Sequence, residues 1–399
     1  MPTVTMNTKP SGRRSASSLL AAAAIASLIP LTFAVMADRS GLSLFAEGPL
    51  SSGRSRILFA AASEKGDGAG AVTSASQLVR WAPLSRGSVS ALGVAYELNG
   101  ELQLAQNAFR VASSFGWRDE VAQTFAVRQA LSNEEYELAA FRMEALLRAE
   151  PEGALTTAML ADVAATPLAR QALAVRMGED LEWTDNVLLG LDETPKEEIV
   201  ARISLLDEAR QQGYRPADRQ ARWETFALYE KDPSASWLLW QALFGPGELE
   251  TAGMWDANFG VASSTGSGSS APFEWHRLKA STAQVRQVEG GGGKRLEVVG
   301  VSYTPQDVAQ QSVGVIPGRY VLAWQSSKEE EGRPDLHLSA TCKSVGGTVT
   351  LGPIVPADGG FGRLLNVDRD CQMVTLRIFA PSGRPAPRWL EAPQMARID

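Results

Sequence analysis

The sequence predicts a multidomain chain of the α-then-β class: an N-terminal membrane segment, an α-solenoid, and a C-terminal antiparallel β-sandwich that is jelly-roll-like. Three observations carry this prediction. An uncharged run follows a basic N-terminus, apolar residues recur at intervals of three and four from Thr73 to about Phe244, and short alternating runs follow Gly245. The length of 399 residues also exceeds that of one typical domain.

Residues 1–37 are predicted to be a cytoplasmic stub and a membrane anchor or signal peptide. Three basic residues precede the uncharged run Leu19–Ala37, whose length approaches the roughly 20 residues that span a bilayer and favours an uncleaved anchor. Against an anchor, Pro30 interrupts the run and Val35-Met36-Ala37 suits a signal peptidase. We therefore expect an inner-membrane protein with its bulk in the periplasm, or a periplasmic or secreted protein cleaved after Ala37.

Charge and composition limit the partners. The formal net charge is −7 and the sequence pI is about 5.2, and no block of Lys and Arg occurs beyond the N-terminus. Such a chain has no electrostatic reason to approach phosphate backbones, so we expect no nucleic-acid partner. Residues 38–72 mix Gly, Ser and Arg with little apolar period, which predicts a flexible tether.

A helical domain is predicted over residues 73–249, and small and bulky residues follow a distinctive order near its start. The residues that carry this order are Leu92, Gly93, Tyr96, Ala105, Phe109 and Ala112. Their spacing resembles the tetratricopeptide repeat, whose signature is Leu-Gly-x-x-Tyr, later Ala-x-x-x-Phe, and then Pro. The resemblance implies that helix pairs cross closely at the small residues. It also implies a curved stack of helices that docks a protein partner.

The 34-residue period of that family can be checked within the sequence. A step of 34 residues from Ala105 leads to Ala139, and Pro83 and Pro151 stand one period before and after Trp117, where the signature has Pro. We expect one full repeat, one degenerate repeat and a preceding half. The later helical stretches continue or cap the stack, or form a plain bundle without a groove.

The β-domain is predicted over residues 250–399. Five runs have strand chemistry and are separated by Gly, Pro or Asp clusters: Arg295–Tyr303, Gly318–Ser326, Asp335–Lys343, Gly347–Ile354 and Cys371–Ala380. Strands at short spacing with no helical pattern between them predict an antiparallel sandwich.

The two cysteines of the chain, Cys342 and Cys371, both lie in this domain. An exported chain meets an oxidising compartment, so we expect them to pair, which would stabilise the domain by roughly 3–4 kcal/mol. Two unpaired buried thiols are the alternative.

No residue set makes a convincing active site. His276 and His337 are the only histidines, they lie in predicted strands, and no nucleophile elbow accompanies them. No Cys/His spacing resembles a zinc set, and the Gly-rich stretches lack the Lys-Ser/Thr of a phosphate loop. We expect no catalytic residues, no metal and no cofactor. The sandwich carboxylates leave one alternative, a glycan-processing hydrolase or lyase that uses a pair of them.

Tryptophan is the residue type that could mark a sugar platform, because an indole stacks on the apolar face of a sugar ring. The candidates for carbohydrate binding are Trp255, Trp275, Trp324 and Trp389. The competing interpretation is that these side chains belong to the core. The alternation in Phe273-Glu274-Trp275-His276 favours that interpretation for Trp275, and we expect Trp324 to be in the core as well.

The order of parts, with Asn258-Phe259, Pro317–Trp324 and a cysteine-containing strand pair, resembles exported proteobacterial proteins whose C-terminal domains are similar to carbohydrate-binding modules. The resemblance implies work in the cell envelope or in exopolysaccharide assembly or export. We therefore expect a non-enzymatic scaffold that docks a protein through its helices and contacts polysaccharide through its sandwich.

Overall fold

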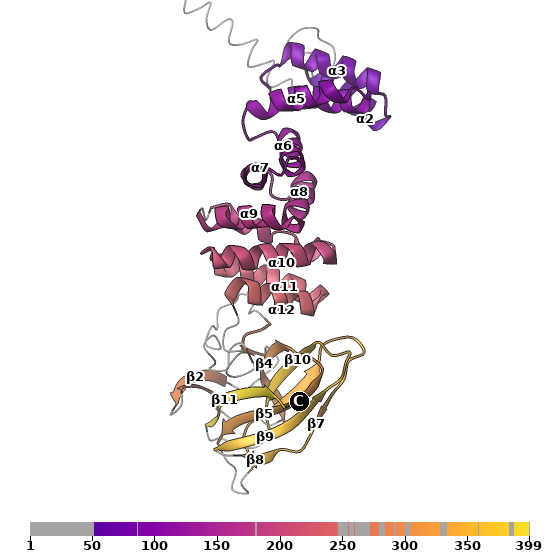
Figure 1. Ribbon diagram of the computed structural model, residues 1–399. Helices are drawn as coiled ribbons and strands as arrows, with labels where there is room; N and C mark the ends of the chain where they lie inside the picture. Colours follow the sequence, from indigo (N-terminus) through magenta and orange to yellow (C-terminus); the bar gives the residue numbers. More distant parts are fainter. Residues whose placement is uncertain are drawn as a thin grey trace, which may run out of the picture. The chain divides into compact units, whose positions relative to one another are not determined.

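The computed structural model describes residues 52–85, 87–179, 182–245, 254, 259, 272–278, 284–290, 293–299, 304–327, 333–357, 359–382 and 387–398. Helices precede antiparallel β-sheets in the chain, as the sequence predicts (Figure 1). The predicted membrane segment at residues 19–37 lies outside the described residues. Among the helices that are described, none combines the length and the hydropathy needed to cross a bilayer.

Eleven α-helices form the helical part of the described chain. They are α2 (Ser52–Glu64), α3 (Gly68–Trp81), α4 (Ser88–Leu98), α5 (Leu102–Ser114), α6 (Glu120–Ser132), α7 (Tyr136–Ala149), α8 (Ala154–Ala165), α9 (Pro167–Glu179), α10 (Lys196–Gln211), α11 (Asp218–Lys231) and α12 (Pro233–Phe244). Two short 3₁₀ helices, η3 (Thr184–Leu188) and η4 (Leu191–Glu193), precede α10.

The chain divides into two compact units, Met1–Gln129 and Ala130–Asp399. The second unit holds the helices from α7 onwards together with all the β-strands. The predicted boundary between residues 249 and 250 therefore separates helices from strands. It does not separate two compact units, because the second unit contains residues on both sides of it.

The tether predicted over residues 38–72 is wrong from Ser52 onwards, because α2 and the start of α3 lie there. This segment is rich in small side chains, which gave little apolar pattern in the sequence but allow the helices to pack closely. Ala71 and Ala75 of α3 pack with Ala95 of α4 and with Phe59 of α2, where short side chains let the helix backbones approach closely. Asp67 begins α3 by accepting a hydrogen bond from the Gly70 N–H at 2.9 Å.

The turn between paired helices recurs every 34 residues. Each turn has three residues, and its middle residue is in the left-handed region: Gly66 at φ 69°, Gly100 at φ 80° and Glu134 at φ 60°. The next residue then donates its N–H to the carbonyl five residues earlier, over 2.8–2.9 Å in all three turns. This is the bond of a Schellman C-cap, so three helices end in one geometry at one period.

The helix that follows each turn buries the same three positions. The equivalent residues are Ala71, Ala105 and Ala139, then Ala75, Phe109 and Met143, then Leu78, Ala112 and Leu146, and all nine are buried. Pro83 and Pro151 each lie two residues beyond the end of such a helix, where proline cannot continue it. Leu92 and Tyr96 of α4 are half-buried.

The sequence predicts that paired helices cross closely at the small residues Gly93 and Ala105 and that Phe109 fills the space between them, and the structure places the Phe109 ring directly against Gly93. A methyl group on Gly93 would lie 2.7 Å from a carbon of the Phe109 ring, which is closer than carbon atoms approach. Helices α4 and α5 therefore cross with only a hydrogen atom at this position.

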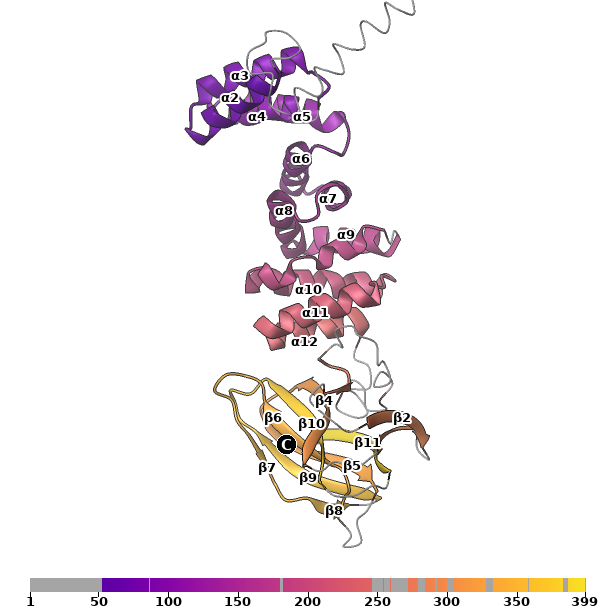
Figure 2. The same cartoon turned by 180° about the vertical axis from the view of Figure 1, so that it is seen from behind.

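The strands form two antiparallel sheets. They are β1 (His276–Arg277), β2 (Gln284–Gly290), β3 (Gly293–Val299), β4 (Gln306–Gly314), β5 (Gly318–Ser326), β6 (His337–Cys342), β7 (Val349–Leu351), β8 (Val355–Ala357), β9 (Gly360–Val367), β10 (Met373–Ala380) and β11 (Arg388–Arg397). One sheet has the order β1-β4-β10-β6, and the other β2-β3-β11-β5-β9-β7, with β8 also paired to β9. Figure 2 shows β10 lying between β4 and β6.

One apolar core lies between the two sheets, and it includes Trp275, Trp324, Leu338, Leu365 and Leu376. The five predicted runs correspond to β3, β5, β6, β7 and β10. Cys342 at the end of β6 and Cys371 just before β10 form a disulfide, as predicted.

A second apolar cluster joins the helices to the four-stranded sheet within the Ala130–Asp399 unit. Tyr229, Trp237 and Trp240 pack there with Phe273 and Met373. The Tyr229 hydroxyl and the Ser312 hydroxyl share a 2.7 Å hydrogen bond. Helices α11 and α12 therefore cover one face of the four-stranded sheet.

Candidate functional site

A groove of about 500 Å³ lies between α7 and α9. It is lined by Tyr136, Glu137, Leu168, Gln171, Ala172, Val175, Arg176 and Glu179. We call it the α7–α9 groove. Leu168 and Val175 of α9 are exposed. On α7, Phe141 is 49% exposed and follows the lining residues Tyr136 and Glu137 by about one turn. Exposed apolar side chains that lie together along a groove are a feature of binding surfaces, whereas single exposed ones are ordinary.

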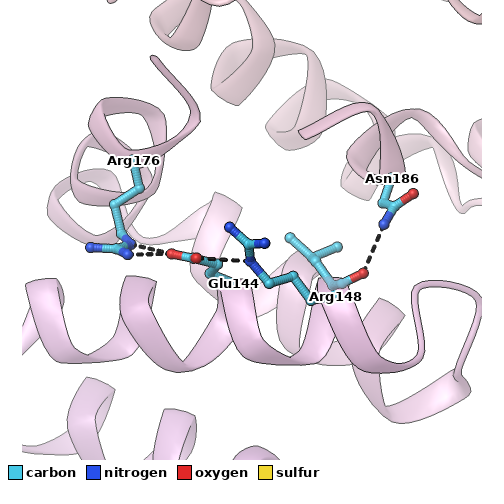
Figure 3. Close-up of polar contacts among 5 residues, drawn as sticks. Glu144, Arg148, Arg176 and Asn186 are labelled. Carbon is cyan, nitrogen blue, oxygen red and sulfur yellow. Dashed lines mark hydrogen bonds and ion pairs between the residues drawn. The ribbon is translucent and has the colours of Figure 1, made fainter. Parts of the chain in front are cut away.

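Two arginines and one carboxylate fix the wall of this groove (Figure 3). The Arg176 Nε donates to Glu144 Oε2 at 2.7 Å, and the Arg148 Nε donates to Glu144 Oε1 at 2.9 Å. Glu144 is mostly buried, so a charge-assisted bridge from α9 to α7 holds the two helices in register.

Two further contacts keep the wall in place. The Asn186 side chain donates to the Leu147 carbonyl at 2.8 Å and so ties η3 to α7 (Figure 3). The Arg176 guanidinium lies 5.1 Å from the centre of the Phe141 ring, a cation–π distance. Arg176 thus connects the carboxylate bridge to the exposed aromatic side chain.

The chemistry of the α7–α9 groove suits binding. Its lining combines apolar side chains with Arg176, Glu137 and Glu179 as charges and Gln171 as a hydrogen-bonding amide. It contains no Ser, Cys or His that could act as a nucleophile or base. An extended or helical peptide with apolar anchors and polar flanks matches such a lining.

Sequence reasoning missed this groove. The one available signal was the apolar residues of α7 and α9 that prove to be exposed. They recur at intervals of three and four, which is also the spacing of apolar residues that face a core. Only the pairing of α7 with α9 distinguishes the two faces.

The structure corrects the predicted sugar-binding tryptophans. Trp275 is 1% exposed and Trp324 is 2% exposed, both within the core between the sheets, which confirms the core interpretation expected for both. Neither can stack on a sugar, so their candidacy for carbohydrate binding is wrong. Trp324 also donates its indole N–H to the Leu336 carbonyl at 3.1 Å. Trp389 is half-buried beneath the Arg295 guanidinium, 5.4 Å from the ring centre. Trp255 lies outside the described residues.

The histidines have structural surroundings. His276 shares a hydrogen bond between its Nδ1 and the Glu274 carbonyl oxygen at 3.0 Å, and burial lowers its pKa. The His337 ring packs against Phe379 in a tilted arrangement with ring centres 4.6 Å apart, and burial together with the Arg363 charge lowers its pKa. Both rings are therefore neutral at pH 7.

The sandwich carboxylates have separate partners. Glu274 pairs with Arg222 of α11, Asp307 pairs with Arg377 at 3.3 Å, and Asp368 accepts from the Thr348 backbone N–H at 2.7 Å. Within the described ranges, no group of three or more His, Cys, Asp or Glu side chains could hold a metal ion.

Comparisons with known proteins give no family. No family model matches this chain, and no curated protein matches it. Among solved structures, endoglucanase CelQ from Clostridium thermocellum in complex with cellotriose is similar, with 11% identity and a TM-score of 0.14, over 79% of this chain and 70% of that chain. A TM-score of this size carries no argument about fold or function.

Proposed function

We propose that the chain is a non-catalytic scaffold of the cell envelope that docks a protein partner through tetratricopeptide-like helix pairs. The observation that carries the proposal is the left-handed turn that recurs at Gly66, Gly100 and Glu134. A period of 34 residues is the period of that repeat family, whose stacked pairs present an extended binding surface. The α7–α9 groove supplies an open site with apolar side chains beside α7, the helix that follows the third of these turns.

Export supports a place in the envelope. The uncharged run Leu19–Ala37 is proposed to carry the chain to the inner membrane with its bulk in the periplasm, or to be cleaved after Ala37. The disulfide between Cys342 and Cys371 supports this location, because disulfides persist in oxidising compartments.

The sandwich is proposed to be of the jelly-roll type found in carbohydrate-binding modules, and to contact polysaccharide during exopolysaccharide or envelope-glycan assembly or export. Trp389 is the described candidate residue that is not fully buried. The test is electrophoresis of the full chain through gels that contain envelope polysaccharide. We expect the gel to retard the chain and Trp389→Ala to reduce the retardation, whereas Trp81→Ala, in helix α3, leaves it unchanged. Free migration of the unmodified chain would remove the glycan part of the proposal.

Docking is tested in intact cells with a photo-crosslinking amino acid at position 168, on the exposed edge of the α7–α9 groove. We expect a discrete adduct with one protein, and we expect Val175→Asp in the same groove to abolish it. The matched control is position 84, where Leu84 is exposed in the loop after α3. No adduct at 168, or the same adducts at both positions, would contradict docking at this groove.

A further inference from the structure

A second hollow, of about 940 Å³, lies among the α7–α8 loop, α8, the η4 segment, α10 and α11. Its lining includes five carboxylates and one aromatic side chain: Glu152, Asp192, Glu193, Glu198, Trp223 and Glu224. We call it the acidic hollow. It differs from an acidic surface patch because it has volume and because one of its carboxylates is buried.

Glu224 is the buried carboxylate, at 6% exposed. Within the described residues its hydrogen bond comes from Gln220, one turn earlier on α11, at 3.2 Å, and it forms no ion pair with an Arg or Lys. Arg202 of α10 is also buried nearby, but its guanidinium donates to the Leu189 carbonyl at 3.0 Å. The Arg202 charge offsets part of the cost of this buried carboxylate, but the two side chains form no direct ion pair, so Glu224 can still accept a cation from outside the fold.

The electrostatic surroundings agree with this reading. Burial and the Asp192 charge raise the pKa of Glu224 to about 7, and Arg202 opposes the rise. The other charges facing the hollow are Glu152, Glu193 and Glu198, while Lys231 is engaged with Asp192 at 2.8 Å. The potential inside the hollow is therefore negative.

Trp223 supplies a second feature that suits a cation. Its indole is 60% exposed and lines the hollow one residue before Glu224. An exposed indole beside carboxylates can hold an ammonium or guanidinium group by cation–π attraction while the carboxylate neutralises its charge.

We propose that the acidic hollow binds a lysine or arginine side chain presented by a peptide segment of the protein partner, with Glu224 as its counter-ion and Trp223 against its side. This inference rests on the proposed docking function and names the chemistry of the docked segment. A cation fits because five carboxylates line the hollow, whereas the cations found near them in the described residues are Lys231, paired with Asp192, and the buried Arg202, which acts on Glu198 and Glu224.

The test is calorimetric titration of the full chain in detergent, at low ionic strength, with the peptide Ac-Gly-Lys-Gly-Lys-Gly-NH₂. We expect saturable binding that Glu224→Gln weakens by about tenfold, because a hydrogen bond to a charged group is lost. Trp223→Ala should weaken it by roughly threefold or more. Binding should tighten from about pH 6 to about pH 8 as Glu224 ionises, and Glu224→Gln should remove that dependence.

The matched control is Glu230→Gln, which removes one charge from the exposed face of the same helix and should leave the affinity unchanged. The acetyl-lysine version of the peptide should not bind. No saturable binding, equal weakening by Glu224→Gln and Glu230→Gln, or tighter binding of a chitosan oligomer than of the peptide would each overturn the inference. The crosslinking test at position 168 uses residues outside the hollow. A failure of the docking proposal can therefore be distinguished from a failure of this inference.

Discussion

Gly93 lies where a side chain has no room. The Phe109 ring that a methyl group would meet is itself stacked on Phe125, with ring centres 4.7 Å apart, so it cannot move away freely. We expect Gly93→Ala to destabilise the α4–α5 pair by about 1–3 kcal/mol, which is the usual cost of overpacking. Hydrogen exchange of peptides from Ser88–Ser114 measures this. Adding Phe109→Leu should restore part of the protection, and unchanged exchange in the single variant would contradict the close crossing.

Glu224 predicts a dependence of stability on pH. Its pKa in the folded chain is about 7, above the value near 4.5 of an exposed glutamate, so the unfolded chain loses this proton first as pH rises. The contribution of Glu224 to stability is therefore fully present below about pH 4.5 and is lost as pH rises through about pH 7. We expect the Tm of Glu224→Gln, relative to the unmodified chain, to be higher at pH 8 than at pH 5. Equal differences at both pH values would contradict the raised pKa.

At the scale of elements, β4 and α12 meet at one glycine. A methyl group on Gly314 would lie 2.3 Å from the Trp237 indole, which already packs edge-on against Phe273 at 4.9 Å. We expect Gly314→Ala to loosen α12 from the sheet and to speed hydrogen exchange in both elements. Gly362→Ala in β9 is the control, because its nearest neighbour would lie at an ordinary 3.4 Å. Equal effects of the two substitutions would argue against this junction.

The disulfide joins β6 to the start of β10 across 29 residues of chain. Removing it with Cys342→Ala and Cys371→Ala frees the unfolded loop, and we expect the free energy of unfolding of the sandwich to fall by about 3–4 kcal/mol. Urea denaturation followed by near-ultraviolet circular dichroism measures the change. Reduction of the unmodified chain should produce the same loss, and a much smaller loss would show that the loop is already restrained when unfolded.

Some elements could be predicted from the sequence and others could not, for physical reasons. Runs with apolar alternation, such as β5 and β10, were identified. β4 was missed because Gln311 and Ser312 are buried polar residues, and their partners, the Phe273 carbonyl and the Tyr229 hydroxyl, come from elsewhere in the chain. β11 was missed because Pro393 interrupts it, and a register shift between Glu391 and Gln394 accommodates that proline.

The repeat could be predicted in part from the sequence, whereas the two binding sites could not. Gly93, Ala105 and Phe109 could be assigned because their sizes follow a family signature. The α7–α9 groove and the acidic hollow could not, since each depends on helices that are not neighbours in the chain. Glu224 in particular has the sequence context of an ordinary charge on a helix surface, and its burial follows from tertiary packing, in which α11 contacts η4.

At the scale of the whole molecule, export and the disulfide should depend on one another. We expect deletion of residues 1–37 to keep the chain in the cytosol with Cys342 and Cys371 as thiols, because that compartment is reducing. Alkylation with a polyethylene-glycol maleimide after denaturation should add two labels to the truncated chain and none to the full chain. Two labels on the full chain in cells would contradict its export.

Helices α11 and α12 pack directly against the sandwich. The contacts are the apolar cluster of Tyr229, Trp237 and Phe273 and the ion pair between Arg222 and Glu274. If a force pulls on the strands, the load passes into α11 and α12 through buried aromatic rings and the Arg222–Glu274 ion pair. A force on the strands would therefore reach α11, the helix that carries Trp223 and Glu224, through side chains that already join the two.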